Sequence, residues 1–262
     1  MSKLRFEGEA PVGARLIHVP DPAHQNSNGH RGQVRLNEEQ LRFVDALRDA
    51  ARFFDSQGFS RDSWMVIAGG GVFLYQLATK GATVDRVPTD LDIIIHEKNA
   101  RNGTPILELL RDRMQPHESS LRTEPIMHHG HLLTAAGLST KARNGMPIDV
   151  TTELSQIYPP DHHFRPSMLY SYPPSDLILG SAIRLKHPLL PGQITTAHPG
   201  MIAFYKLIFK REKEGKQDIP DLQRLKRLGL LDPSPALEEV VSTMCLGDRE
   251  FASAIRSAIR DL

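Results

Sequence analysis

The sequence predicts an α+β protein, with a mixed β-sheet flanked by helices and a C-terminal helical region. Between residues 37 and 153, short apolar segments rich in Val and Ile alternate with amphipathic segments of helical spacing. From residue 200 onward helical patterns dominate. We therefore expect three parts: a flexible N-terminal arm at 1–35, an α/β domain at 36–190 and a helical region at 191–262.

The composition is that of an ordinary globular protein. Hydrophobic residues make up 40% and charged residues 24% of the 262 residues, and the formal net charge is +1. This overall charge neither favours nor excludes nucleic acid as a partner. Cys245 is the single cysteine, which excludes an internal disulfide and favours a reducing, cytoplasmic location. No apolar run approaches the roughly 20 residues of a membrane helix, so no membrane association is expected.

The first helix is predicted from Asn37, because Asn37 and Gln40 match a capping box and Gly58 is a suitable stop. The apolar segment 64–68 has the pattern of a buried strand and leads directly into the glycines at 69–71. Next we expect a helix at 72–79 ended by Gly81, a strand at 87–96 and a helix from Thr104. Strands are expected at 131–137 and 146–153, with a turn at Asn144-Gly145 between them. One short helical or strand segment is expected near 177–185, within an irregular connection.

The C-terminal region is predicted to hold helices at 201–214, 219–228, 235–244 and 249–262. Asp218, Ser234 and Asp248 are suitable N-caps, and Gly229 is a suitable stop.

The segment TDLDIIIHE, residues 89–97, places Asp90 and Asp92 at the start of an apolar strand. Residues two apart on a strand point to the same face, so both carboxylates project together while the alternate residues face a core. Two adjacent carboxylates repel each other, and a divalent cation between them removes that repulsion. Mg²⁺, or Mn²⁺ in its place, suits such a pair because it takes one or two carboxylates and completes its shell with water and phosphate oxygens.

Gly69, Gly70 and Gly71 lie between an expected strand and an expected helix. Glycine lets the backbone approach a ligand closely, and a helix N-terminus offers unpaired N–H groups and partial positive charge to a phosphate. Asp149 follows an apolar alternation in MPIDVTTE and could share a face with the first pair if the two strands are neighbours. A third carboxylate of this kind would help to hold a second metal ion or accept a proton.

These motifs resemble those of the DNA polymerase β-like nucleotidyltransferases, in which an apolar strand, Gly-Gly, a helix, D-h-D (h apolar) and a later lone acid follow one another. The segment Arg86-Val87-Pro88-Thr89-Asp90-Leu91-Asp92 is similar to the R-x-x-[ST]-D-h-D element of the AbiEii-type branch, many of whose members are toxins of toxin–antitoxin or phage-defence pairs. A later helix with Lys206 and a D-x-x-D-L element at 218–222 match the same branch. The resemblance runs from about residue 64 to 230 through scattered short motifs, and Gly71 stands where the family often has Ser or Thr.

The resemblance implies a role for each matched residue. Asp90, Asp92 and Asp149 would bind the metal ions, and Gly69 and Gly70 would cradle the triphosphate of an NTP. Lys206 would contact the nucleotide phosphates, where a compact cation stabilises charge on the leaving pyrophosphate, and Asp218 would orient Lys206 or the acceptor. Apart from the resemblance, Arg86, Thr89 and the nearby Arg143 are candidates for contact with a base, ribose or acceptor, and we expect Arg86 and Thr89 to bind the nucleotide.

Structural explanations compete with several of these roles. Glycine-rich turns often serve tight packing alone, Asp218 fits a helix cap, and Lys206 fits the polar face of an amphipathic helix. The basic segments in 206–227 suit an RNA acceptor, but a solvated helical face explains them equally. The histidines of HHGH and DHH (His128, His129, His131, His162 and His163) match no standard zinc spacing and are read as solvated.

The functional hypothesis is therefore a Mg²⁺-dependent nucleotidyltransferase, which moves NMP from an NTP to a hydroxyl and releases pyrophosphate. By resemblance the acceptor is an RNA 3′ end, especially that of tRNA, or next a protein hydroxyl, and an antitoxin is a conceivable partner. Two alternatives stay open. One is a catalytically weak or inactive binding module with the nucleotidyltransferase fold, which Gly71 favours because glycine lacks the hydroxyl of the usual Ser or Thr. The other is a small-molecule nucleotidyltransferase acting on an antibiotic or metabolite.

Overall fold

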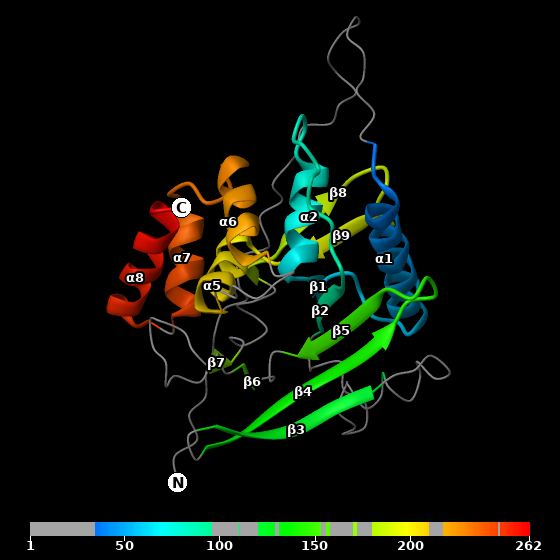
Figure 1. Ribbon diagram of the computed structural model, residues 1–262, viewed down its shortest axis with the longest axis horizontal. Coiled ribbons are helices and arrows are strands. Elements are labelled where there is room, and N and C mark those ends of the chain that lie inside the picture. The colour runs from blue at the N-terminus through cyan, green and yellow to red at the C-terminus, as the bar shows by residue number, and fades with distance from the viewer. Residues whose placement is uncertain are drawn as a thin grey trace, which may run out of the picture.

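The computed structural model describes residues 35–95, 110, 120–128, 131–152, 156–157, 170–171, 180–209, 217–245 and 247–262. Within them, a seven-stranded mixed sheet is flanked by helices, which confirms the predicted α+β class (Figure 1). The strands, in their spatial order across the sheet, are β3 (Ser120–His128), β4 (His131–Lys141), β5 (Pro147–Thr152), β2 (Leu91–Ile95), β1 (Trp64–Val66), β9 (Gln193–Thr196) and β8 (Ile183–Lys186). Two short strands, β6 (Gln156–Ile157) and β7 (Tyr170–Ser171), pair separately.

The described helices form two groups around this sheet. One group comprises α1 (Glu38–Ser56) and α2 (Ala68–Ala78), and the other comprises α5 (Pro199–Phe209), α6 (Asp218–Arg227), α7 (Pro235–Met244) and α8 (Arg249–Arg260). In Figure 1 the second group, yellow to red, gathers on the left, while α1 lies on the right. Helix α2 lies between them and packs against α5 and α6.

Strand β2 occupies the middle of the sheet and has neighbours of both directions. It runs antiparallel to β1 and parallel to β5, while β1 runs parallel to β9 on its other side. The hairpins β3–β4 and β8–β9 and the pair β4–β5 are antiparallel. A central strand is therefore held on both sides, which makes it a rigid support for the side chains that it carries.

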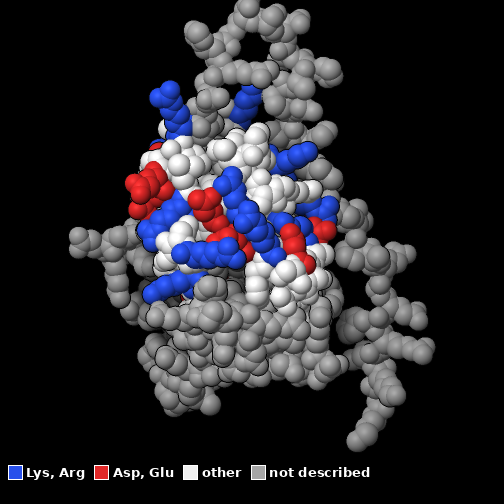
Figure 2. Space-filling model, turned by 90° about the vertical axis from the view of Figure 1, so that its right-hand side faces the viewer, with Lys and Arg blue, Asp and Glu red and all other residues white. Residues whose placement is uncertain are grey.

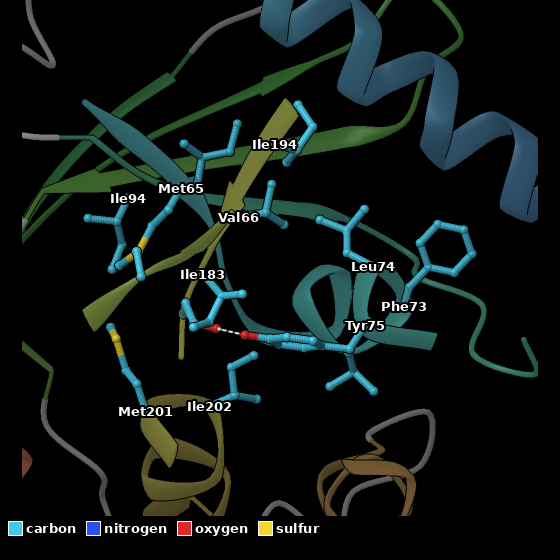
Figure 3. Packing of buried hydrophobic residues seen from close by; sticks show 14 of the residues in the cluster. Met65, Val66, Phe73, Leu74, Tyr75, Ile94, Ile183, Ile194, Met201 and Ile202 are labelled. Atoms are coloured by element: carbon cyan, nitrogen blue, oxygen red, sulfur yellow. Dashed lines mark hydrogen bonds between the residues drawn. The ribbon is translucent and has the colours of Figure 1, made fainter. Parts of the chain in front are cut away.

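The hydrophobic core covers both faces of the central strands. On one face Trp64 packs against Phe54 of α1, with ring centroids 5.1 Å apart. On the other face Met65 and Ile94 lie on the side of Met201 of α5 (Figure 3). Complete burial of these large apolar side chains is the main stabilising contribution, at about 1.5–3 kcal/mol each.

Tyr75 of α2 ties the helix to the end of β9. Its hydroxyl donates a hydrogen bond to the carbonyl oxygen of Ala197 at 2.8 Å, the dashed line in Figure 3. Burial raises the pKa of Tyr75 well above its usual value, so the hydroxyl acts as a neutral donor.

The predicted N-caps and C-terminal glycine stops of the helices are confirmed at most positions. Asn37 and Gln40 form the capping box of α1, and Ser234 and Asp248 cap α7 and α8. The predicted stops Gly58, Gly81 and Gly229 have φ values of 78°, 76° and 70°, a region that favours glycine. The turn at Asn144-Gly145 joins β4 to β5 as expected.

Two strands of the seven-stranded sheet were not predicted, and both extend it; the short separate pair β6–β7 was not predicted either. Strand β3 lengthens one edge by pairing with β4, and β9 pairs with β1 and β8. The short segment 193–196 has no strong strand pattern, and its conformation comes from these tertiary pairings. The division predicted at residue 190 falls within the β8–β9 hairpin, so the sheet continues into the region expected to be helical.

Several predictions concern residues outside those that the structure describes. They are the arm, apart from Arg35, the helix from Thr104, apart from Leu110, and the basic segment 210–216. The histidine at 129 and the DHH motif lie outside as well, as do residues 158–169 and 172–179 of the irregular connection. In the described parts of the chain, no helix is long and apolar enough to cross a membrane.

Candidate functional site

The central feature is a pair of carboxylates on neighbouring strands. Asp92 of β2 and Asp149 of β5 are direct partners in the parallel register. The residues on either side of Asp92, Leu91 and Ile93, are buried at 0% exposure, whereas both aspartates are half-buried. The strand alternation therefore anchors one face in the core and turns both carboxylates to the other face.

Ser139 of β4 extends this pair into a row across three strands. Ser139 is the cross-strand partner of Asp149 in the antiparallel pair β4–β5. Its hydroxyl donates a hydrogen bond to Oδ1 of Asp149. The bond fixes the orientation of the carboxylate, a detail that sequence reasoning missed because β4 and β5 place the two residues opposite each other only after pairing.

Asp90 lies just before β2, together with Thr89. The Thr89 hydroxyl donates to Oδ1 of Asp90 at 3.3 Å, and Asp90 is half-buried while Thr89 is exposed. In the described residues no group of three or more His, Cys, Asp or Glu side chains is arranged to hold a metal ion. The geometry thus brings together Asp92 and Asp149, and leaves the part of Asp90 in metal binding as a prediction.

The glycines form the first turn of helix α2 rather than a separate loop before it. The chain bends one residue earlier, at Ala68, which has a φ of 52° although it is not a glycine. The N–H of Ile67 donates to the carbonyl oxygen of Asp92 at 3.0 Å, so α2 begins beside the aspartate row. Ile67 provides no side-chain cap, in contrast to the caps of α1, α7 and α8.

Packing explains why each of the three positions is glycine. A Cβ at Gly69 would lie 2.3 Å from Nη2 of Arg86, and one at Gly70 would lie 2.9 Å from Phe43. At Gly71 it would lie 2.8 Å from Ile202. At Gly70 and Gly71 a side chain would press into the packed core, whereas at Gly69 only the end of the Arg86 side chain would have to move. Any role in phosphate binding therefore rests on the backbone N–H groups and not on open space around the glycines.

A buried cluster of charges connects α5, α6 and the loop between α2 and β2. Lys206 of α5 places its Nζ 3.2 Å from Oδ1 of Asp218 and 2.8 Å from Oδ2 of Asp221, both on α6. Arg86 and Arg224 also contact Asp221, at 2.9 Å and 3.0 Å. Asp218 and Asp221 are 1% and 0% exposed, so each depends on these cations for compensation of its charge.

The structure corrects the capping role of Asp218 and adds Asp221. The N-cap of α6 is Gln217, whose side chain makes no cap hydrogen bond, and Asp218 is the first helical residue, directed to Lys206. The pair with Lys206 explains why Asp218 is buried instead of capping. From the sequence Asp221 was only part of the D-x-x-D-L element at 218–222, without a role of its own. Its spacing of three from Asp218, on one helix face, was the available signal.

Asp85 joins this cluster to the surface. Partial burial acts to raise its pKa, but hydrogen bonds from Gln76 and Arg224 and the charges of Arg224 and Arg227 outweigh it and lower the pKa. Asp85 therefore remains a carboxylate that holds α6 to the loop between α2 and β2.

A cleft elsewhere on the molecule contains none of these residues. It has a volume of about 290 Å³ and is lined by Arg61, Asp62, Arg184, Pro191, Gly192, Gln193 and Thr195. Its arginines are already paired, Arg61 with Asp55 and Arg184 with Asp62 at 2.8 Å. The cleft at the β8–β9 edge is thus a weaker candidate than the aspartate row.

The face that carries α1 alternates basic and acidic side chains (Figure 2). Arg42 pairs with Glu39 at 3.4 Å, and Arg48 pairs with Asp45 at 2.7 Å. The cations on this helix therefore do not form a continuous basic surface of the kind that binds nucleic acid.

Comparisons with known proteins give likenesses to solved structures only. No family model and no curated protein matches the sequence. Among solved structures, the chain is similar to an antigenic nucleotidyltransferase-like protein from Paracoccidioides brasiliensis, with a TM-score of 0.40 and 16% identity. The alignment covers 87% of this chain and 99% of that chain. Likeness at this level establishes no family, so the functional argument rests on the site itself.

Proposed function

We propose that the protein is a Mg²⁺-dependent nucleotidyltransferase related to the AbiEii-type branch, which transfers NMP from an NTP to a hydroxyl and releases pyrophosphate. The observation that carries this proposal is the in-register pair Asp92–Asp149 beside the uncapped start of α2. It combines two oxygen ligands for a cation with a helix N-terminus that favours phosphate.

The residues present fit a divalent cation. Like charges on neighbouring strands are unfavourable, and a cation held by both carboxylates removes that penalty. Asp92 and Asp149 would hold the ion, with Asp90 beside them, and water and phosphate oxygens would complete the coordination. When bound, the ion supplies polarisation of phosphoryl oxygens and a lower pKa for the acceptor hydroxyl.

Lys206 takes a different part in this proposal from the one first expected. Its Nζ lies between Asp218 and Asp221, and its exposed fraction is 6%. We therefore assign it to the support of the site, where it neutralises the two carboxylates that fix α6 against α2. Direct contact of Lys206 with the phosphates stays a prediction.

The alternative of an inactive binding module loses the argument taken from Gly71. The missing side chain at Gly71 would point at Ile202 and at the hydroxyl of Thr196, which is 0% exposed. A serine at 71 would therefore project into the core, so its absence removes no phosphate contact from the site.

Label transfer tests the proposal. Full-length protein is incubated with each α-labelled NTP, Mg²⁺ and either total RNA or protein lysate, and wild type is compared with Asp92→Asn and Asp149→Asn. Transfer of label to RNA or to protein by wild type and its loss in both variants is expected, with an RNA 3′ end as the favoured acceptor. Asp62→Asn, at an exposed ion pair, is the matched control and should transfer normally.

The proposal fails if wild type transfers no label to RNA, protein or added small molecules and shows no binding of Mg²⁺–NTP by calorimetry. Transfer to a small molecule alone would favour the antibiotic or metabolite alternative. Binding of Mg²⁺–NTP without transfer to any acceptor would favour the binding module.

A further inference from the structure

We propose that Arg86 is a preset phosphate-binding group at the N-terminus of α2, and that Asp221 is the residue that positions it. This inference rests on the proposed function and deepens it, because it names the side chain that meets the triphosphate and the side chain that orients it.

The main chain of Arg86 is held by two buried glutamines. Its N–H donates to Oε1 of Gln76 at 3.0 Å, and its carbonyl oxygen accepts from Nε2 of Gln40 at 3.0 Å. Gln40 and Gln76 are 2% and 3% exposed. The loop between α2 and β2 has no regular secondary structure at this point, yet these bonds fix the origin of the arginine side chain.

Two edges of the guanidinium are occupied as well. Nε lies 2.9 Å from Oδ1 of Asp221, and Nη1 donates to the carbonyl oxygen of Val87. The Arg86 side chain is 8% exposed. The Nε contact is an ion pair without hydrogen-bond geometry, whereas the Nη1 bond is directional. Together they restrict rotation of the planar guanidinium, so its remaining N–H groups have a preferred direction before any ligand arrives.

The remaining nitrogen, Nη2, lies against the first turn of α2. It is the atom that a Cβ at Gly69 would meet. In the described part of the chain it makes no hydrogen bond and, unlike Nε, it is not fully enclosed. Its N–H groups and the uncapped N–H groups of the helix therefore lie together, which suits a phosphate because guanidinium geometry matches phosphate oxygens.

Asp221 is suited to orient Arg86 because it is itself fixed. Its Oδ2 lies 2.8 Å from Nζ of Lys206, and its Oδ1 lies 3.0 Å from Nη1 of Arg224. These contacts hold the carboxylate in place independently of Arg86. Since Asp221 lies on α6, this arrangement makes the C-terminal helices part of the phosphate subsite rather than a separate support.

Pyrophosphate binding to the full-length protein tests the inference, measured by calorimetry with and without Mg²⁺. Arg86→Lys keeps the charge but loses the planar fork, and Asp221→Asn keeps the size but removes the negative charge that attracts Nε. We expect each to weaken pyrophosphate binding by roughly 10- to 100-fold, the range for one charge-assisted hydrogen bond. Arg227→Gln, which removes an exposed cation of α6 that pairs with Asp85 at 3.6 Å, is the matched control and should retain affinity within about twofold.

A second variant covers the case in which these buried substitutions prevent folding. Gly69→Ala leaves every charge in place but forces Nη2 away, because the new Cβ would lie 2.3 Å from it. We expect this variant to fold and to bind pyrophosphate at least about tenfold more weakly.

Three results would overturn the inference. The first is unchanged affinity in folded Arg86→Lys, Asp221→Asn or Gly69→Ala. The second is a loss in Arg227→Gln as large as in the other variants, since the effect would then follow from net charge and not from the orientation of Arg86. The third is the absence of pyrophosphate binding by wild type. Label transfer by wild type in any of these cases would leave the proposed nucleotidyltransferase standing, so the two failures are distinguishable.

Discussion

Asp92 of β2 lies directly opposite Asp149 of β5 in a parallel strand pair. The two carboxylates come from positions 57 residues apart, the difference between 149 and 92, and only the pairing of the strands makes them neighbours. Their proximity is unfavourable unless something of opposite charge lies between them, and this gives the first test of a cation site.

Replacing one charge of this pair should stabilise the metal-free protein. Asp149→Asn keeps the acceptor for Ser139 while it removes the repulsion. Without divalent ions, we therefore expect its free energy of unfolding to exceed that of wild type by about 0.2–1 kcal/mol, measured by thermal unfolding. Mg²⁺ should raise the melting temperature of wild type and have a smaller effect on the variant. Equal Mg²⁺ stabilisation of both proteins would place the ion elsewhere.

Ser139 should tune the affinity for Mg²⁺ through its bond to Asp149. In Ser139→Ala the carboxylate loses its fixed orientation, which corresponds to about 1 kcal/mol and a several-fold weaker Mg²⁺ affinity by calorimetry. Ser139→Thr retains the hydroxyl and should bind Mg²⁺ nearly as wild type does. Identical affinities of the alanine and threonine variants would contradict a positioning role for the serine.

Gly71→Ser should destabilise the protein without improving activity. The new Cβ would lie 2.8 Å from Ile202 and 2.9 Å from the Thr196 hydroxyl, and overpacking of this kind costs about 1–3 kcal/mol. Denaturant unfolding measures the difference. Gly180→Ser is the matched control, because nothing lies within 4 Å of a Cβ there, and its stability should be unchanged. A stable and more active Gly71→Ser would restore the argument for a missing phosphate contact.

His198 should make the fold sensitive to acid. Burial lowers the pKa of His198 from 6.5 to about 4, and its Nδ1 accepts a hydrogen bond from the N–H of Gly200. Between pH 6.5 and 4 the unfolded chain binds a proton at this site that the folded protein does not bind, so stability falls as the pH falls through this window. The accumulated loss is about 3 kcal/mol at pH 4.

His198→Asn isolates this contribution, because Oδ1 of asparagine can replace Nδ1 as the acceptor. The variant should lose less stability than wild type between pH 6.5 and 4, as measured by urea unfolding at a series of pH values. Parallel pH profiles of the two proteins would show that His198 does not titrate on unfolding.

The sequence by itself determined most of the local structure. The capping box at Asn37, the caps Ser234 and Asp248 and the glycine stops are short-range features, set by hydrogen bonds and φ preferences within a few residues. The alternation around Asp92 also sufficed to predict that Leu91 and Ile93 are buried, although Ile94, on the face of Asp92, is buried as well. Such patterns are legible because their physical causes act between near neighbours in the chain.

The tertiary structure decided which of these residues meet. It set Asp92 against Asp149 and Ser139 against Asp149, formed β9 by pairing it with β1, and turned Asp218 from a helix cap into a partner of Lys206. It also showed that the glycines at 69–71 pack against residues distant in sequence, which limits the space for a side chain there. Strand register, burial of charge and close packing depend on contacts between remote segments, and no local pattern records those contacts.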